Sequence, residues 1–335
     1  MPPHLRFTVP SSAIEEYGNS LVTSVIITEE GKILMADYSQ QVVKMSSLQH
    51  FHRLEDAVYV GQTPWSLVQL TDGVVAVTME DQPDITFLRI NGSDLEIDSE
   101  IQTKRRYRGV AEFGNDTLIV STRRNDDDWS DLEARIDVIT REGIVCDTLL
   151  TGEEFSDLVD PLYLTRRGND VYVSDWASHR VHVLNLESRN VSSLFGSMDL
   201  SELGLYQPRV VAFDDNTGDM YVATGGRVCN PYSYRDYFCV IQVSPTGRWR
   251  NLENYTSRNG GMFPYGIDVT DSQIIISWGQ WRYGGWHTEL TAYDLPQSVE
   301  ESSRPSSSQT PPSSTLGLES SSQTVPTSTV GTSGE

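Results

Sequence analysis

A short pattern recurs along this chain, and its repetition constrains the fold more than any other feature. A proline is followed by a turn-rich segment and then by an apolar run, as in the stretch from Pro161 to Asp175. The pattern returns from Pro64 to Thr78 and from Pro264 to Trp278. Its two ends lie 14 residues apart in all three copies (78 − 64, 175 − 161 and 278 − 264).

Three looser copies complete the set and give the repeat its period. They end at Asp37, Thr122 and Thr224, so the six units are spaced by 41, 44, 53, 49 and 54 residues. A period of roughly 40 to 50 residues built from short strands is typical of β-propeller blades. We therefore predict an all-β fold, a six-bladed β-propeller with four antiparallel strands in each blade.

The two ends of the repeat array predict how the ring closes. The sixth unit has no fourth strand, because the chain turns to Ser, Thr and Pro after Pro296. The stretch from His4 to Val9 has alternating apolar character, and we expect it to supply the missing strand and remove an exposed sheet edge. Residues 1–296 are thus predicted to form the propeller, and residues 297–335 a disordered Ser/Thr/Pro-rich tail.

The fourth unit and the linker after it resemble the NHL repeat. A Phe-Gly exit at Phe195-Gly196, a proline at Pro208, and Asp175 followed by Arg180 match that pattern, and Asp37 matches its aspartate again. The resemblance covers roughly residues 4–296 and implies a six-bladed propeller similar to the divergent C-terminal NHL propellers of invertebrate tripartite-motif (TRIM-NHL-like) proteins. Those propellers recognise protein or RNA partners. No RING, B-box or coiled coil occurs in this sequence, so the resemblance implies no ubiquitin-ligase activity.

The match to the NHL pattern is uneven along the chain. The aspartate is replaced at Thr78, Thr122, Thr224 and Trp278. The segment Val173-Ser174-Asp175-Trp176 is also similar to the YWTD blades of lipoprotein-receptor propellers. Both kinships predict six blades.

Three long segments between second and third strands mark one face as the predicted working surface. They run from Arg123 to Ala134, from Gly225 to Phe238 and from Gly279 to Glu289. The last two are rich in aromatic and arginine residues, which are common interface hot spots. The predicted partner-binding residues are Tyr232, Tyr234, Arg235, Tyr237, Trp281, Arg282, Tyr283 and Trp286. The alternative is that these rings, with Phe238, pack on one another and cap the propeller end.

Basic residues near the third inner strand suggest an RNA-binding or anion-binding patch on that face. They are Lys104, Arg105, Arg106, Arg108, Arg123 and Arg124. Asp126, Asp127 and Asp128 follow directly and can neutralise the patch. Arg166 and Arg167 lie in a first-to-second-strand turn, so we expect them at the opposite end of the ring.

The sequence contains no recognisable catalytic constellation. Glu112 and Asp268 are the obvious inner-strand carboxylates, a weak basis for the metal-dependent lactonase or esterase chemistry of some propellers. The acidic run from Asn125 to Asp128 lacks the spacing of a calcium loop. No phosphate loop, G-x-S-x-G elbow or CxxC pair occurs, so we expect no cofactor, no metal and no enzymatic activity.

Composition narrows the classes of partner. The net charge of −22 and the pI near 4.5 work against nonspecific binding to nucleic acid or anionic membranes. The 335-residue sequence has neither a membrane-length apolar run nor a signal-like N-terminus, and its three cysteines are an odd number. We expect a monomeric cytoplasmic protein. The alternative is an extracellular one, in which Cys229 and Cys239 would pair and four N-x-S/T sequons could carry glycans.

These observations favour non-catalytic recognition of a protein or peptide through the long aromatic segments. An RNA-binding propeller is the alternative, and a metal-dependent hydrolase is the third reading.

Overall fold

The structure is a computed structural model of the chain. It describes residues 4–10, 19–50, 53–114, 116–122, 133–194, 205–226, 238–255, 262–270, 272–282 and 285–295. This part of the chain is all-β, and it holds no helix long and apolar enough to cross a membrane. The chain divides into the units Met1–Ser298 and Val299–Glu335. The predicted tail lies outside the described residues.

The described residues form six antiparallel sheets, and each sheet is one blade. Blade 1 contains β2 (Val22–Ile27), β3 (Lys32–Asp37), β4 (Val42–Ser47) and β5 (Leu54–Tyr59). Blade 2 contains β6 (Pro64–Gln69), β7 (Val75–Met79), β8 (Asp84–Asn91) and β9 (Asp94–Gln102). Blade 3 contains β10 (Tyr107–Gly114), β11 (Thr117–Thr122), β12 (Arg135–Thr140) and β13 (Val145–Thr151).

The remaining blades follow the same order, with two variations. Blade 4 contains β14 (Pro161–Arg167), β15 (Asp170–Asp175), β16 (Arg180–Asn185) and the short β17 (Val191–Ser193). Blade 5 has a split inner strand, β18 (Leu205–Tyr206) and β19 (Val211–Phe213), followed by β20 (Met220–Gly226), β21 (Phe238–Val243) and β22 (Trp249–Tyr255). Blade 6 contains β23 (Phe263–Val269), β24 (Gln273–Arg282), β25 (Gly285–Asp294) and, from the other end of the chain, β1 (His4–Pro10).

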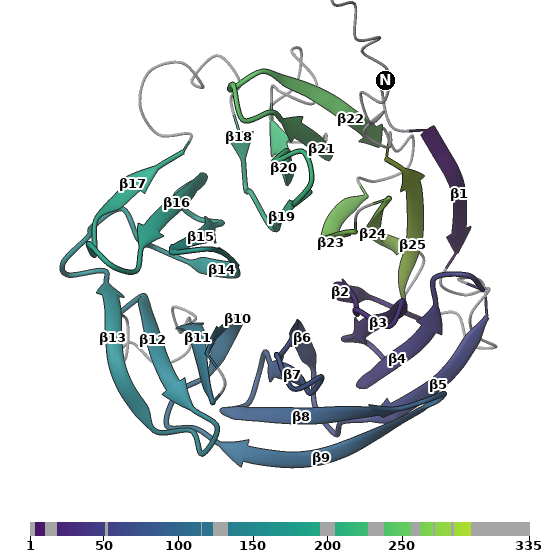
Figure 1. Ribbon diagram of the computed structural model, residues 1–335, viewed down its shortest axis with the longest axis horizontal. Coiled ribbons are helices and arrows are strands. Elements are labelled where there is room, and N and C mark those ends of the chain that lie inside the picture. Colours follow the sequence, from purple (N-terminus) through teal and green to yellow (C-terminus); the bar gives the residue numbers. More distant parts are fainter. Residues whose placement is uncertain are drawn as a thin grey trace, which may run out of the picture. The chain divides into compact units, whose positions relative to one another are not determined.

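The inner strands contact one another in a closed ring around a central channel. The order is β2, β6, β10, β14, β19, β23 and back to β2 (Figure 1). Among the described residues, six apolar clusters join the blades. Five of them each contain residues of two neighbouring blades, and the sixth contains residues of blades 2, 4, 5 and 6. Strand β7 illustrates the pattern, because all its residues are buried. The predicted six-bladed propeller is confirmed.

The predicted closing strand is also confirmed. β1 pairs with β25 in antiparallel register, from His4 opposite Asp294 to Pro10 opposite Glu289. The outer edge of blade 6 is therefore covered by the N-terminal segment (Figure 1). Closure of this kind ties residues nearly 300 positions apart into one sheet and leaves no open edge on β25.

Five inner strands carry a β-bulge near their first residue, where a bulge re-aims a side chain. The pairing register shifts between Val22 and Ser24, Pro64 and Ser66, Tyr107 and Val110, Pro161 and Tyr163, and Pro264 and Gly266. The prolines of the sequence repeat therefore mark the place where the strand bends at the channel. The residue after each proline is the one that the bulge displaces from the ladder.

The register corrects one equivalence drawn from the sequence. Pro161 pairs with Asp175 and Pro264 with Trp278, but Pro64 pairs with Met79 rather than Thr78. The turn between β6 and β7 is one residue longer than the turn between β23 and β24, because Gln69 pairs with Val75 whereas Val269 pairs with Ile274. Equal spacing along the sequence therefore did not mean equal position in the blade.

Hydroxyl side chains of the second strands connect neighbouring blades. Ser277 accepts a hydrogen bond from the N–H of Gly266 at 2.8 Å and donates one to the carbonyl of Val22 in blade 1 at 3.2 Å. Thr78 and Ser121 make the same pair of bonds in blades 2 and 3. Each hydroxyl satisfies an N–H freed by the bulge and links two blades at once.

Candidate functional site

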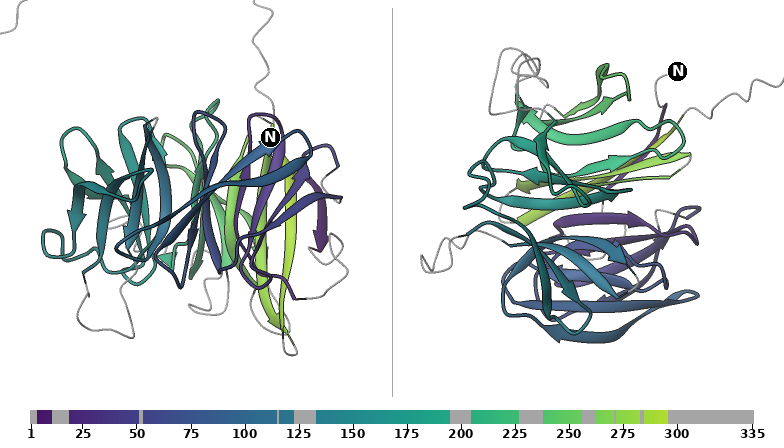
Figure 2. Two further views of the ribbon diagram at one scale, coloured as in Figure 1. Left: turned by 90° about the horizontal axis from the view of Figure 1, so that it is seen from below. Right: turned by 60° about the vertical axis from the view of Figure 1, so that its left-hand side comes forward.

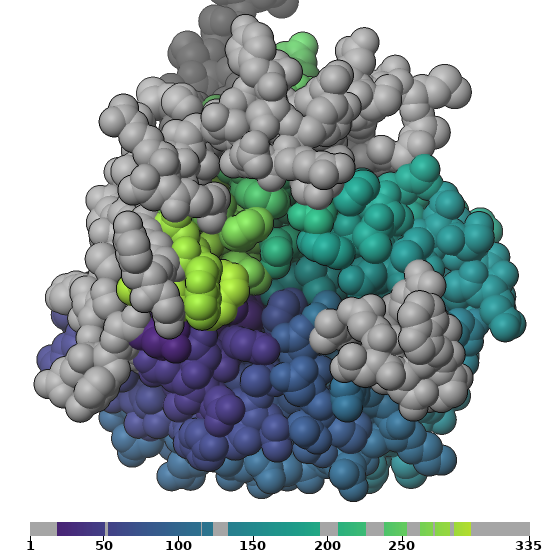
Figure 3. Space-filling view, turned by 180° about the vertical axis from the view of Figure 1, so that it is seen from behind, coloured from purple at the N-terminus to yellow at the C-terminus, as the bar shows by residue number. Residues whose placement is uncertain are grey.

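The third predicted loop is a β-hairpin rather than a loop. β24 and β25 continue their pairing past Trp278 until Arg282 lies opposite Gly285. The hairpin, lime in Figure 2, projects beyond the ring on the face where second strands lead into third strands. Figure 3 shows this face with the lime hairpin beside the blue and teal blades. The ladder of backbone hydrogen bonds makes this extension more rigid than the predicted loop.

Trp281 is the exposed aromatic residue among those that the structure describes in the hairpin. Its side chain is 57 % exposed and meets Trp286 edge-on, with ring centroids 5.6 Å apart. Trp286 in turn meets the buried Tyr265 edge-on at 6.2 Å. The backbone N–H of Trp286 donates to Asn19 Oδ1 at 2.7 Å, and its carbonyl accepts from the N–H of Ser20 at 3.0 Å. Each of the two predictions for these rings therefore applies to one residue. Trp286 packs against the propeller end, whereas Trp281 is exposed to solvent.

Most other predicted partner-binding residues lie outside the described residues. These are Tyr232, Tyr234, Arg235, Tyr237 and Tyr283, and the structure gives only the backbone of Arg282. Phe238, at the end of the blade 5 segment, is buried and packs on Phe263 with ring centroids 4.4 Å apart. Phe238 therefore belongs to the core between blades 5 and 6.

The predicted basic patch is divided by the fold. Lys104 and Arg106 are exposed and Arg105 is half-buried, whereas Arg108 is buried. Arg108 forms an ion pair with Glu80 and lies over the Trp65 ring, 4.6 Å from its centroid. Arg123 and Arg124 lie outside the described residues.

Aromatic side chains gather at this end of the channel in a cluster that we name the aromatic cap and define as Tyr38, Trp65, Tyr163, Phe263, Tyr265 and Trp286. Trp65 of blade 2 stacks on Tyr163 of blade 4 at 5.8 Å, a contact between blades that are not neighbours. The Tyr163 hydroxyl donates to the carbonyl of Thr23 in blade 1 at 2.7 Å. Tyr163 therefore crosses the channel, and its burial raises the pKa of its hydroxyl.

A second arginine joins the cap from blade 5. Arg209 is 9 % exposed, and its guanidinium lies 4.2 Å from the Tyr265 ring centroid and 5.5 Å from that of Phe263. Arg108 and Arg209 are the residues after Tyr107 and Pro208, as Trp65 follows Pro64 and Tyr265 follows Pro264. Trp65, Arg108, Arg209 and Tyr265 therefore share one repeat position. This shared position is visible in the sequence, but we did not predict from it that its side chains meet in the channel.

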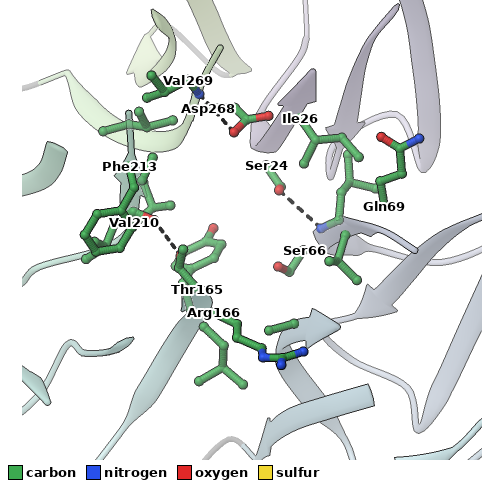
Figure 4. A pocket seen from close by; sticks show the side chains of 18 of the residues that line it. Ser24, Ile26, Ser66, Gln69, Thr165, Arg166, Val210, Phe213, Asp268 and Val269 are labelled. Carbon is green, nitrogen blue, oxygen red and sulfur yellow. Dashed lines mark hydrogen bonds between the residues drawn. The ribbon is translucent and has the colours of Figure 1, made fainter. Parts of the chain in front are cut away.

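The opposite end of the channel is an open cavity of about 480 Å³. Its wall combines apolar residues with Ser24, Ser66, Gln69, Thr165, Glu112 and Asp268 from five of the six blades (Figure 4). Arg166 and Arg167 reach the mouth of this cavity, as the sequence predicted, at the end away from Lys104. The Arg166 guanidinium donates to the carbonyls of Glu112 at 3.3 Å and Phe113 at 3.0 Å.

The two inner-strand carboxylates act as links between blades. Asp268 accepts from the N–H of Ile27 in blade 1 at 2.5 Å, and Glu112 accepts from the N–H of Thr71 in blade 2 at 2.8 Å. Burial raises the pKa of Asp268 to about 7, although its backbone hydrogen bonds act in the opposite direction. Among the described residues no group of three or more His, Cys, Asp or Glu side chains is placed to hold a metal ion.

A second cavity, of about 500 Å³, lies between blades 4 and 5 on the outside of the ring. One of its lining residues, Leu194, directly follows β17, which has 3 residues. Leu194 and Trp249 line it and are 40 % and 43 % exposed. Its lining is mostly apolar, with Arg167 at its inner end.

Comparisons with solved structures agree with the fold. Virginiamycin B lyase from Staphylococcus aureus is 11 % identical over 87 % of this chain and 99 % of its own, with a TM-score of 0.53. The calcium-binding protein regucalcin from Agrobacterium tumefaciens is 11 % identical over 88 % of this chain and 94 % of its own, with a TM-score of 0.56. A chain of a nidogen/laminin complex is 14 % identical over 75 % of this chain and 85 % of its own, with a TM-score of 0.52.

At this level of identity the likeness extends to the propeller fold alone, since enzymes and binding proteins share it. No protein-family model matches the sequence, and no curated protein matches it.

Proposed function

We propose that this propeller is a non-catalytic recognition module that binds a protein or peptide on the face carrying the β24–β25 hairpin. The observation that carries the proposal is Trp281, a large aromatic side chain that is more than half exposed on an extended two-stranded ladder. Tryptophan is enriched among interface hot spots because it buries a large area with few rotatable bonds.

The support beneath Trp281 favours recognition further. Trp286 holds it from one side, Tyr265 holds Trp286, and Asn19 and Ser20 bind the Trp286 backbone. A side chain held in place before binding loses less conformational entropy when the partner arrives. The arrangement therefore suits an anchor residue for a partner surface.

A kinship with NHL propellers of tripartite-motif proteins is part of the proposal. The aspartates that match the NHL pattern, Asp37 and Asp175, hold equivalent backbone groups in blades 1 and 4. Exposed Lys104 and Arg106 leave RNA as the competing partner.

The test compares partner capture by the folded wild-type chain, Trp281→Ala and the matched variant Trp249→Ala. Trp249 is also an exposed tryptophan, but it lies in the cavity between blades 4 and 5. We expect the wild type and Trp249→Ala to retain the same protein partner. The affinity of Trp281→Ala for that partner should be at least tenfold lower, a loss of roughly 1.4 kcal/mol of binding free energy. The retention should survive nuclease treatment.

Two results would contradict the proposal. Equal capture by all three chains would make Trp281 a structural cap residue. Capture that disappears with nuclease, falls steeply with salt and depends on Lys104 and Arg106 would make the propeller an RNA-binding one.

A further inference from the structure

The cap end of the channel holds more buried positive charge than the described carboxylates balance. Arg108 and Arg209 are 7 % and 9 % exposed, and Glu80 is paired with Arg108. Arg209 forms no ion pair or side-chain hydrogen bond with any described residue, and its contacts are the rings of Tyr265 and Phe263. Buried arginine is rare unless it is paired.

Three buried N–H donors in this region also have no acceptor among the described residues. They are Nε1 of Trp65 and the Nε atoms of Arg108 and Arg209. A cation–π contact attracts the charge of a guanidinium but takes up none of its N–H donors. Buried donors are normally satisfied by protein, water or a bound ion, so three together indicate an absent acceptor.

The three donors belong to one place in the channel. Arg108 lies over Trp65, and Trp65 stacks on Tyr163. Arg209 lies over Tyr265, which belongs to the same buried cluster as Trp65 and Tyr163. Tyr163 in turn spans the channel to Thr23, so all three donors belong to the aromatic cluster that this bridge crosses.

We infer that the cap end of the channel is an oxyanion site formed by Arg209 and Arg108, with Trp65 Nε1 as a further donor, and that its ligand is a carboxylate. A carboxylate only accepts hydrogen bonds and matches the planar fork of arginine. The carboxylate is either a free small molecule or an acidic side chain of a partner.

This site goes beyond the proposed function and does not depend on Trp281. A carboxylate bound there would sit at the centre of the same face, among donors from blades 2, 3 and 5.

The experiment measures malonate binding by calorimetry and by the shift in melting temperature, with chloride at equal ionic strength as the reference. We expect saturable binding to the wild type, about tenfold weaker binding to Arg209→Gln, and no change in Arg89→Gln. Arg89 is a matched control, because it is an exposed arginine of blade 2 paired with Asp98. Without malonate, Arg209→Gln should melt at or above the wild-type temperature, because it removes an unpaired buried charge.

Two results of the malonate titration would count against this site. Equal shifts in all three chains, or no saturation up to about 50 mM malonate, would overturn the proposal. If Arg209→Gln does not fold, Arg209→Lys keeps the charge and should retain part of the affinity. Tighter binding of inorganic phosphate than of malonate would overturn the carboxylate assignment.

Two further probes complete the design. The first probe is a peptide that contains aspartate, compared with the same peptide carrying asparagine instead. If the aspartate peptide binds more tightly than malonate and the asparagine peptide does not bind, the carboxylate belongs to a partner side chain. Malonate binding that is unchanged in Trp281→Ala shows the site to be independent of the proposed partner surface, and its loss there would contradict that independence.

Discussion

One residue position of the repeat carries much of the local order of a blade. Asp37 and Asp175 each accept hydrogen bonds from N–H groups before the inner strand and from the turn residue three positions later. The residue seven positions later is a base in both blades: Lys44 pairs with Asp37, and His182 lies 3.7 Å from Asp175. A single carboxylate at the end of the second strand thus holds both the segment before the inner strand and the turn that follows the second strand.

Removing the Asp175 carboxylate should destabilise the chain markedly. Burial disfavours its charge, but His182 and the N–H groups of Val159, Ser178 and Asp160 outweigh burial and lower its pKa. Asp175→Ala would leave these buried donors without an acceptor, so we expect a loss of roughly 2–4 kcal/mol in the free energy of unfolding at pH 7. Urea unfolding measures it, and a loss below about 0.5 kcal/mol would refute the bridging role.

Asp268 should make stability depend on pH in the opposite sense to an ordinary carboxylate. Its pKa is raised from 3.8 to about 7, so between these values the folded chain keeps a proton that the unfolded chain has lost. The free energy of unfolding therefore falls as the pH rises from 4 to 7. Asp268→Asn keeps an oxygen that accepts the hydrogen bond from Ile27. As the pH rises from 4.5 to 8, the free energy of unfolding of this variant should increase by about 1–3 kcal/mol relative to that of the wild type. Parallel curves for the two proteins would disprove the shift.

At the scale of elements, β1 and the β24–β25 hairpin are the parts that decide closure and exposure. β1 covers the edge of β25 from one side, while residues 19 and 20 bind the hairpin backbone at Trp286. The N-terminal part of the chain therefore supports both the ring and the surface proposed for recognition.

Deleting residues 1–10 should destabilise the ring far more than deleting residues 299–335. The first deletion removes the β1–β25 ladder and exposes the edge of β25, whereas the second removes a separate unit. We expect a melting temperature lower by roughly 5–10 °C and concentration-dependent self-association in the first variant only. Calorimetry and size-exclusion chromatography check this, and similar behaviour of the two variants would contradict the closing role.

At the scale of the whole molecule, the cysteines bear on the compartment in which the chain works. Cys239 is buried and disulfide-bonded, and Cys146 is free and exposed. The remaining cysteine, Cys229, lies outside the described residues. Disulfides persist mainly in oxidising compartments, so the redox state of Cys239 in the natural protein tests the cytoplasmic expectation against the extracellular alternative. The sequon residues Asn91 and Asn190 are exposed, as glycosylation would require.

Alkylation in denaturant without reductant should therefore label Cys146 alone in protein isolated from its natural source. Reduction before alkylation should label all three cysteines, as mass spectrometry of the peptides would show. Labelling of all three without reduction would contradict the disulfide and favour the expected cytoplasmic location over the extracellular alternative.

Periodicity along the sequence was enough to predict the six blades, their strand order and the closing strand. These features depend on local alternation and on a regular spacing of turns, which are written in consecutive residues. The repeat also placed Arg166 and Arg167 at the end of the ring away from Lys104. It failed by one residue at Thr78, because a longer turn in blade 2 keeps the spacing but shifts the register.

The channel and the exposed surface depend on contacts between residues far apart in the chain. Trp65 meets Tyr163, and Tyr163 reaches Thr23, only because the closed ring brings their blades to one axis. The segment from Gly279 to Glu289 has the composition of a loop, yet continued backbone pairing makes it a hairpin. Local pattern specifies the blades, whereas burial of Arg108 and Arg209 and exposure of Trp281 follow from how the blades pack around the channel.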